Sequence, residues 1–179
     1  MTAIDPMLQR AIDAIALPGI LVDHRLIADG DELALLPEEL VALGSSVLKV
    51  RRASGAARIV ARKLLSRFGQ SPCAIPRGAA GMPLWPHGLV GSLAHDSKVA
   101  IAAMAARRDF LSVGIDVEPA EPLNPDLLGM VATPRELERI ADDPCGGRLL
   151  FSIKDRRFKD AWMESKAQFM KVDLSLIHI

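Results

Sequence analysis

The stretch Val113-Gly114-Ile115-Asp116-Val117-Glu118 alternates apolar and polar side chains, and the rest of the chain can be arranged around it. Successive side chains of a strand point to opposite faces, so the alternation predicts a strand with its branched residues turned toward a core. Asp116 and Glu118 then share the other face, about 7 Å apart. Two neighbouring carboxylates repel each other unless a cation lies between them, and their oxygens suit Mg²⁺. An edge strand with a solvated polar face gives the same pattern, so both interpretations stay open.

Composition restricts the class of protein. The 179 residues are half hydrophobic, and 22 basic residues balance 22 acidic ones. Such a chain has no overall field to attract nucleic acid or a membrane surface. Cys73 and Cys145 have no metal-ligand spacing and fit a reducing compartment. Asp5 and Asp13 stand where a signal peptide would be apolar, and no apolar run reaches the ~20 residues of a membrane span. We expect a soluble cytoplasmic protein that binds neither nucleic acid nor membrane.

A long amphipathic helix is predicted from Val50 to Phe68, where apolar residues recur at intervals of three and four. Its other faces are strongly basic. A basic helix face is often only solvated, but guanidinium groups also bind phosphate in a bidentate way. The basic residues are Lys49, Arg51, Arg52, Arg58, Arg62, Lys63 and Arg67.

A loop rich in proline and glycine follows, from Ser71 to Gly91, and loops of this length in a compact domain are usually functional. It leads to His95, whose type fits either a structural histidine or a ligand contact. Further on, Thr133-Pro134-Arg135-Glu136 predicts a helix start with a capping box, which gives Glu136 a structural role that competes with a catalytic one.

The segment from Leu149 to Trp162 predicts a last helix whose narrow aromatic stripe contains one carboxylate, Asp155. Lys154 and Lys159 flank that stripe. An ion pair between Asp155 and Lys159 on the helix surface would contribute only a few tenths of a kcal/mol. A carboxylate on a buried face needs a stronger partner, and a metal ion would supply it.

Five ordered motifs resemble one enzyme family. They are Ala57-Arg58-x-x-Ala61-Arg62, Gly81-Met82-Pro83-Leu84-Trp85-Pro86, Gly91-Ser92-x-x-His95, Gly114-Ile115-Asp116-x-Glu118 and Phe151-Ser152-x-Lys154-Asp155-x-x-Phe158-Lys159. Their order and spacing resemble the 4′-phosphopantetheinyl transferases, in particular the siderophore-synthase branch that is similar to enterobactin synthase component D. The resemblance covers about residues 36–162.

The resemblance implies an α+β, pseudo-dimeric fold of two similar halves, residues 1–110 and 111–179, each with a small antiparallel sheet and packed helices. It implies a monomer that transfers 4′-phosphopantetheine from coenzyme A to a serine of an acyl or peptidyl carrier protein and releases adenosine 3′,5′-bisphosphate. Mg²⁺, or Mn²⁺ in its place, would be required. The chemistry of the residues agrees, because a pyrophosphate must be neutralised before an oxygen can attack it.

Carried over residue by residue, the resemblance gives Asp116, Glu118 and Asp155 as metal ligands. It gives catalytic roles to Asp155, Glu136 and Lys159, and it places Arg58 at the 3′-phosphate of the ribose. The full set of residues that it implies at coenzyme A is Arg51, Arg58, Arg77, Gly78, Ala79, Ala80, Ala94, His95, Asp116, Lys154, Asp155 and Lys159.

The sequence also departs from the family. Asp155 stands where the family has glutamate, Ala94 where it usually has serine or threonine, and Ala57 where it has glycine. The match fades past Trp162, and we expect an incomplete second half. One alternative is a non-catalytic paralogue or fragment that binds coenzyme A or a carrier protein. Another is an unrelated metal-dependent phosphatase or nuclease, disfavoured because no further Asp/His cluster is present. The sequence assigns neither the pathway nor the carrier protein.

Overall fold

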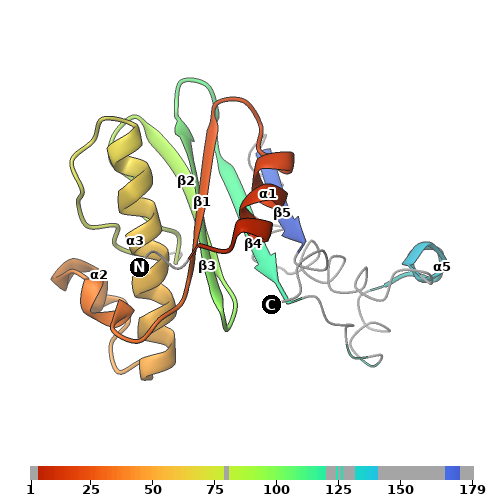
Figure 1. The fold of residues 1–179 in the computed structure, drawn as a ribbon, viewed down its shortest axis with the longest axis horizontal. Coiled ribbons are helices and arrows are strands. Elements are labelled where there is room, and N and C mark those ends of the chain that lie inside the picture. Colours follow the sequence, from red (N-terminus) through yellow and green to blue (C-terminus); the bar gives the residue numbers. More distant parts are fainter. Residues whose placement is uncertain are drawn as a thin grey trace.

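A computed structural model describes residues 4–78, 81–119, 124, 126, 132–140 and 168–173 (Figure 1). Helices and strands are mixed along the chain, and the expected α+β class is confirmed. In order, the elements are α1 (Pro6–Ile15), β1 (Ile20–Leu26), the 3₁₀ helix η1 (Asp31–Ala34), α2 (Pro37–Val41), α3 (Leu48–Arg67), β2 (Leu89–His95), β3 (Val99–Ala106), β4 (Val113–Glu118), α5 (Pro134–Ile140) and β5 (Gln168–Asp173).

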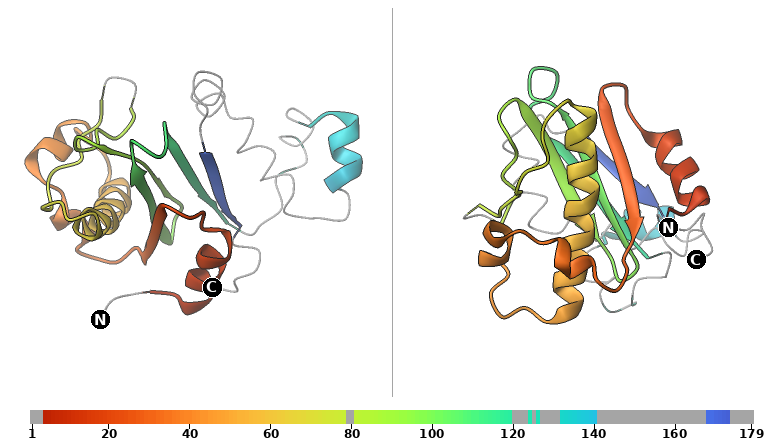
Figure 2. Two further views of the ribbon diagram at one scale, coloured as in Figure 1. Left: turned by 90° about the horizontal axis from the view of Figure 1, so that it is seen from above. Right: turned by 60° about the vertical axis from the view of Figure 1, so that its left-hand side comes forward.

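Strand β3 lies at the centre of a three-stranded antiparallel sheet with the order β1-β3-β2. Every residue of β3 from Val99 to Ala105 is buried. A strand covered on both faces is expected to be a continuous apolar run, and the alanine- and valine-rich sequence of β3 meets that need. Figure 2 shows the two covering layers, with α3 on one side of the sheet and β4 with β5 on the other.

Small side chains set the distance between α3 and the sheet. Ala56 and Ala57 of α3 pack against Ala100 of β3 in one cluster, and Leu64 packs with Met104 in the next. Alanines on both surfaces let the helix backbone approach the strand closely. The predicted helix from Val50 to Phe68 is thus confirmed, and it begins slightly earlier, at Leu48.

The other face of the sheet is covered by α1 and β4. Leu8 and Ile12 of α1 share a core cluster with the apolar residues of β4. Along β4 the residues are alternately buried and half-buried, with Asp116 and Glu118 among the half-buried ones. The strand predicted from this alternation is therefore confirmed, and its apolar face does turn toward a core.

Strand β4 pairs with β5, and the two run parallel, from Val113 opposite Gln168 to Glu118 opposite Asp173. This pair differs from the small antiparallel sheet expected for the second half. Parallel neighbours need a crossover of about a dozen residues or more, and the 119–167 connection between these two strands is long enough to provide it. Because β4 also lies against β2 and β3, the two halves share one core, and the boundary near residue 110 stays a prediction.

Helix α5 begins at Pro134, directly after Thr133, as the capping pattern predicted. Near the end of the chain, strand β5 runs from Gln168 to Asp173, where apolar and polar residues alternate only weakly. The helix predicted from Leu149 to Trp162 lies outside the described residues. Within the described ranges, none of the helices has both the length and the hydrophobicity needed to span a bilayer.

Candidate functional site

Arg58 lies on the face of α3 that turns into the protein, and only 3% of it is exposed. Its Nε atom donates to the carbonyl of Ile75 at 3.2 Å, and its Nη1 donates to the carbonyl of Ser54 at 3.2 Å. The carboxylate of Glu39 lies 3.5 Å from Nε. The remaining nitrogen, Nη2, has no partner among the described residues. A buried guanidinium with a donor to spare is suited to an anion.

Arg77 lies close enough to Arg58 to affect its pKa, and both arginines lie close enough to His95 to affect the pKa of that ring. Burial is the main cause that lowers the pKa of Arg58, and Glu39 opposes this effect. The positive charges of Arg77 and Arg62 lower that pKa further. Three separate segments, α3, the loop after it and the end of β2, thus bring two arginines and a histidine near one another.

His95 is the last residue of β2 and is exposed. Partial burial of the ring is the main cause that lowers its pKa, and the nearby Arg77 and Arg58 lower it further, while Asp96 opposes them. The ring is therefore neutral near neutral pH and can donate a hydrogen bond to a phosphate oxygen without adding a third full charge.

The loop before β2 holds Arg77 through a small backbone ladder. Leu84 donates its N–H to the carbonyl of Pro76 at 2.8 Å, and Gly78 donates to Met82 at 2.8 Å. Arg77 itself is bridged to Pro83. Residues 76–78 and 82–84 of the loop that the sequence predicted to be functional are therefore paired like the two arms of a hairpin, with Arg77 in the first arm. The predicted contacts Ala79 and Ala80 lie outside the described residues.

Glu39 lies within ion-pair distance of Arg58, and the sequence did not single it out because it is an ordinary acidic residue in the first turn of α2. It is completely buried. It accepts from Arg62 Nη1 at 2.8 Å and from the N–H of Ile75 at 2.8 Å. A glutamate three residues after the N-cap often bonds back to the start of its own helix, and Glu39 does so to Leu36. The capping pattern in the sequence did not indicate that Glu39 also contacts residues of α3.

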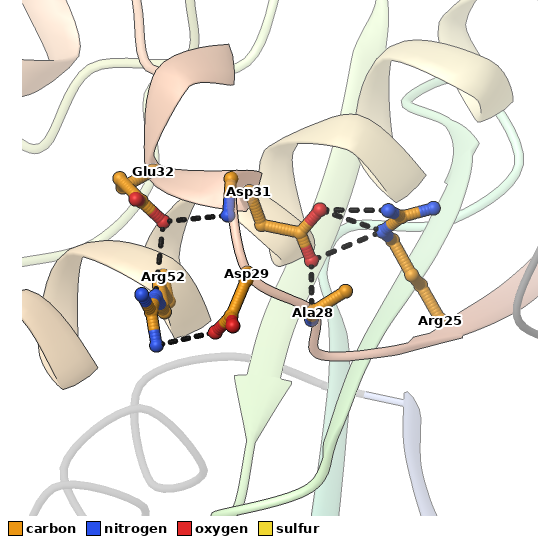
Figure 3. A network of polar contacts seen from close by, with 7 residues as sticks. Arg25, Ala28, Asp29, Asp31, Glu32 and Arg52 are labelled. Carbon is orange, nitrogen blue, oxygen red and sulfur yellow. Dashed lines mark hydrogen bonds and ion pairs between the residues drawn. The ribbon is translucent and has the colours of Figure 1, made fainter.

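Arg52, Arg62 and Lys63, three of the other basic residues of α3, form ion pairs with acidic residues of the protein. Arg52 reaches both Asp29, at 2.6 Å, and Glu32, at 3.1 Å (Figure 3). Lys63 pairs with the buried Asp23. These ion pairs hold the segment that contains η1, and the strand β1, against α3. Arg52 and Lys63 therefore have a structural role. A shallow pocket nearby is lined by Lys49, Arg52 and Asp96 among others, away from Arg58 and Arg77.

Arg51 contributes to the site less directly than expected. Its Nη2 donates to the carbonyl of Gly44 at 2.7 Å, and its Nε is buried without a partner in the described part of the chain. Arg51 and Arg58 are seven residues apart, about two helical turns, so they lie on the same side of α3 roughly 10 Å from each other. A phosphate contact for Arg51 stays a prediction.

The paired carboxylates are where the sequence placed them. Asp116 and Glu118 share the half-buried face of β4, and each has an interaction with its surroundings. Within the described ranges, no group of three or more His, Cys, Asp and Glu side chains could hold a metal ion. The third predicted ligand, Asp155, lies outside those ranges. Two adjacent carboxylates of this kind fit the oxygen ligands that Mg²⁺ prefers.

The remaining predicted residues are only partly placed. Ala94 lies on β2, opposite Ile101 of β3, and is half-buried. Glu136 lies in the first turn of α5, where the structure describes its backbone. Lys154 and Lys159 belong to the segment outside the described residues. Their roles, like those of Asp155, stay predictions.

The fold is an α+β arrangement in which two arginines and a histidine from three segments lie near one another, and in which strand β4 carries two carboxylates. Residues 36–105, which contain Arg58, Arg77 and His95, match the model of the 4′-phosphopantetheinyl transferase N-terminal domain.

Curated relatives agree with this match. The chain is 36% identical over 149 residues to the 4′-phosphopantetheinyl transferase Npt of Nocardia iowensis, covering 82% of this chain and 67% of the relative. It is 38% identical over 158 residues to the 4′-phosphopantetheinyl transferase Svp of Streptomyces mobaraensis, covering 83% and 64%. It is 31% identical over 123 residues to enterobactin synthase component D of Escherichia coli K12, covering 64% and 56%.

The chain belongs to the 4′-phosphopantetheinyl transferase family, and the resemblance that the motifs indicated is confirmed. It spans about two thirds or less of the length of these relatives.

Proposed function

We propose that this chain transfers 4′-phosphopantetheine from coenzyme A to a serine hydroxyl of an acyl or peptidyl carrier protein. The observation that carries the proposal is the convergence of Arg58, Arg77 and His95 in a chain of this family. Coenzyme A presents a ribose 3′-phosphate and a pyrophosphate, which are the anions that such a cluster suits. Arg58, with its free Nη2, would bind the 3′-phosphate, while Arg77 and the loop that carries it would lie along the adenosine.

The reaction forms one bond and breaks one. The serine oxygen attacks the phosphorus nearer to pantetheine, the bond from that phosphorus to the bridging oxygen breaks, and adenosine 3′,5′-bisphosphate leaves. Negative charge grows on the leaving oxygen and must be stabilised by cationic groups placed in advance. His95, at the end of β2, would donate to a phosphate oxygen. Mg²⁺ held by Asp116 and Glu118 would supply charge neutralisation at the pyrophosphate.

The serine proton needs a base, and the candidates are Asp155 and Glu136. Asp155 would also complete the metal ligands, and Lys154 and Lys159 would bind phosphate oxygens. These assignments rest on the resemblance of their motif to the family. The free thiol of Cys73 suits a reducing cytoplasm, where carrier proteins and coenzyme A are found together, and a monomer suffices for this chemistry.

Mass spectrometry of an apo-carrier protein tests the proposal. Incubated with this chain, coenzyme A and Mg²⁺, the carrier should gain the mass of one phosphopantetheine group. A carrier whose acceptor serine is changed to alanine should gain nothing, and a chelator should stop the reaction. No mass gain on a panel of acyl and peptidyl carriers, with coenzyme A still bound by this chain, would contradict the transferase proposal.

That last outcome would support the alternative, a non-catalytic member of the family that binds coenzyme A or a carrier protein. Ala94 favours it, because this position on β2 lacks the hydroxyl that the family usually has there. Calorimetric titration of coenzyme A into the protein distinguishes the two functions, since binding without turnover is the mark of the alternative.

A further inference from the structure

Glu39 connects three parts of the fold through one buried carboxylate. Its Oε1 accepts from Arg62 of α3 and from the backbone N–H of Ile75, both at 2.8 Å, and lies 3.5 Å from Nε of Arg58. Its Oε2 accepts from the N–H of Leu36 at 2.9 Å. Glu39 therefore fixes the start of α2, the middle of α3 and the beginning of the loop that carries Arg77 relative to one another.

The same carboxylate orients Arg58. The Nε edge of that guanidinium faces Glu39 and the carbonyl of Ile75, a residue whose own N–H Glu39 holds. With Nε and Nη1 directed into the protein, Nη2 is the donor left over. The direction in which Arg58 presents its free donor is thus set by Glu39 twice, once directly and once through Ile75.

Charge balance also points to Glu39. Arg58 and Arg62 are both mostly buried, and Arg77 adds a third positive charge nearby. Buried charges of one sign repel strongly in a medium of low dielectric constant unless a counter-charge is present. Glu39, completely buried and within ion-pair distance of both Arg58 and Arg62, supplies that counter-charge.

We propose that Glu39 is a positioning residue that holds Arg58 in the orientation required to bind the 3′-phosphate of coenzyme A, and that it thereby sets the preference for coenzyme A over dephospho-coenzyme A. This inference rests on the proposed function, because it assigns the 3′-phosphate to Arg58. Glu39 does not touch the ligand.

The two physical effects of removing this charge have opposite signs. If Glu39 acted only as a negative charge near an anion site, replacing it with a neutral residue would strengthen phosphate binding. If it positions Arg58, the neutral residue lets the guanidinium turn away from this orientation, and phosphate binding weakens. The direction of the change in affinity therefore separates positioning from simple electrostatics.

The experiment is calorimetric titration of coenzyme A and of dephospho-coenzyme A into the full chain and its variants. We expect the parent protein to bind coenzyme A at least tenfold more tightly than dephospho-coenzyme A. In Glu39→Gln, this ratio should fall at least fivefold while the affinity for dephospho-coenzyme A changes less than twofold. Glu38→Gln, on the exposed side of the same helix, is the matched control and should keep the parent ratio.

A double variant tests whether Glu39 acts through Arg58. Arg58→Ala should remove the preference for coenzyme A, and Arg58→Ala/Glu39→Gln should bind both ligands as Arg58→Ala does. Independent, additive losses would overturn the inference.

Removing one member of a buried ion pair can unfold a protein, whereas replacing both members is often tolerated. Should Glu39→Gln fail to fold, Glu39→Gln/Arg62→Met removes both charges and leaves Arg58 without its carboxylate. Thermal unfolding monitors the fold of each variant. The same fall in the ratio is expected in the double variant.

The outcomes separate the two proposals. A parent protein that binds both ligands equally would overturn the 3′-phosphate role of Arg58 and, with it, the role of Glu39. A parent that prefers coenzyme A, together with a folded Glu39→Gln protein that keeps or increases the preference, would overturn the role of Glu39 alone.

Discussion

The carbonyl oxygen of Asp31 lies where a side chain on Gly55 would begin, since a Cβ placed on Gly55 would come within 2.0 Å of it. The 3₁₀ helix η1 therefore packs directly on the backbone of α3. The side chains of Asp31 and Glu32 then extend to Arg25 of β1 and Arg52 of α3 (Figure 3). Three segments meet at this point, just N-terminal to Arg58 on the same helix.

Gly55→Ala decides between two effects of opposite sign. Glycine inside a helix is less favourable than alanine by about 1 kcal/mol, so helix propensity alone predicts a more stable protein. The contact with the Asp31 backbone cannot be relieved by a side-chain rotation, and overpacking of this kind costs roughly 1–3 kcal/mol. We expect a net loss of unfolding free energy, measured by urea denaturation. A Gly55→Ala protein more stable than the parent would show that η1 moves away without cost.

Asp31→Asn should destabilise the fold more than Asp29→Asn. Asp31 is 3% exposed, and its Oδ1 atom accepts a hydrogen bond from Nη2 of Arg25 at 2.7 Å. This contact raises the pKa of Arg25. Loss of a charge-assisted hydrogen bond at a buried acceptor costs about 1–3 kcal/mol. Asp29 is 88% exposed, so its pair with Arg52 should contribute too little to measure. Denaturant unfolding of both variants checks the order, and equal losses would contradict it.

His24 should make stability depend on pH. It is buried beside Asp23, accepts from the N–H of Asp5 at 3.1 Å, and lies near Lys63. Burial lowers the pKa of His24 below its ordinary 6.5, although Asp23 and Asp5 oppose this. The unfolded chain then binds the proton more readily, so stability is complete above 6.5 and falls as the pH drops through the lowered value.

The measurement is the difference in unfolding free energy between the parent and His24→Gln at about pH 7.5 and about pH 5. The parent should lose more stability than the variant over this range. The exposed His87, changed to glutamine, is the control and should behave as the parent does. Equal pH dependence in the parent and His24→Gln would contradict the prediction.

Asp116→Ala should abolish transfer and leave the fold intact, because Asp116 lies on the half-buried face of β4 and not among its core residues. Activity lost to a chelator should return with Mg²⁺ or Mn²⁺ in the parent but not in the variant. Asp109→Ala, at an exposed turn before the strand, should keep the parent rate. Turnover by Asp116→Ala at the parent rate would exclude it as a metal ligand.

Asp155 is expected to be a shortened metal ligand. Aspartate withdraws its oxygens by about 1.5 Å relative to the glutamate of the family, and Mg²⁺ requires distances of ~2.0–2.1 Å, so coordination through water is expected. Asp155→Glu should raise the rate and lower the Mg²⁺ requirement, and Asp155→Ala should be nearly inactive. Initial rates across a Mg²⁺ titration test this. If Asp155→Ala has the same initial rate as the parent at every Mg²⁺ concentration, Asp155 is only a partner in a surface ion pair.

Local patterns in the sequence were sufficient to predict two of the elements that build the core. The alternation from Val113 to Glu118 predicted β4, and the spacing of apolar residues predicted α3. The resemblance to the family selected Arg58, Arg77 and His95, which lie near one another in the structure, and their roles stay predictions. The two confirmed elements share a cause: periodicity is set by the backbone geometry of a single segment, and the sequence records that geometry directly.

Partners that come from distant segments could not be read from any pattern. Nothing near Glu39 in the chain indicates that it lies between Arg58 and Arg62, and nothing near Arg52 indicates its pairs with Asp29 and Glu32. The parallel pairing of β4 with β5 is a further case. Whether a charged side chain is solvated, paired or free for a ligand depends on which surfaces pack against it. Those surfaces come from distant parts of the chain, so the surroundings of a charged side chain are determined by the tertiary structure.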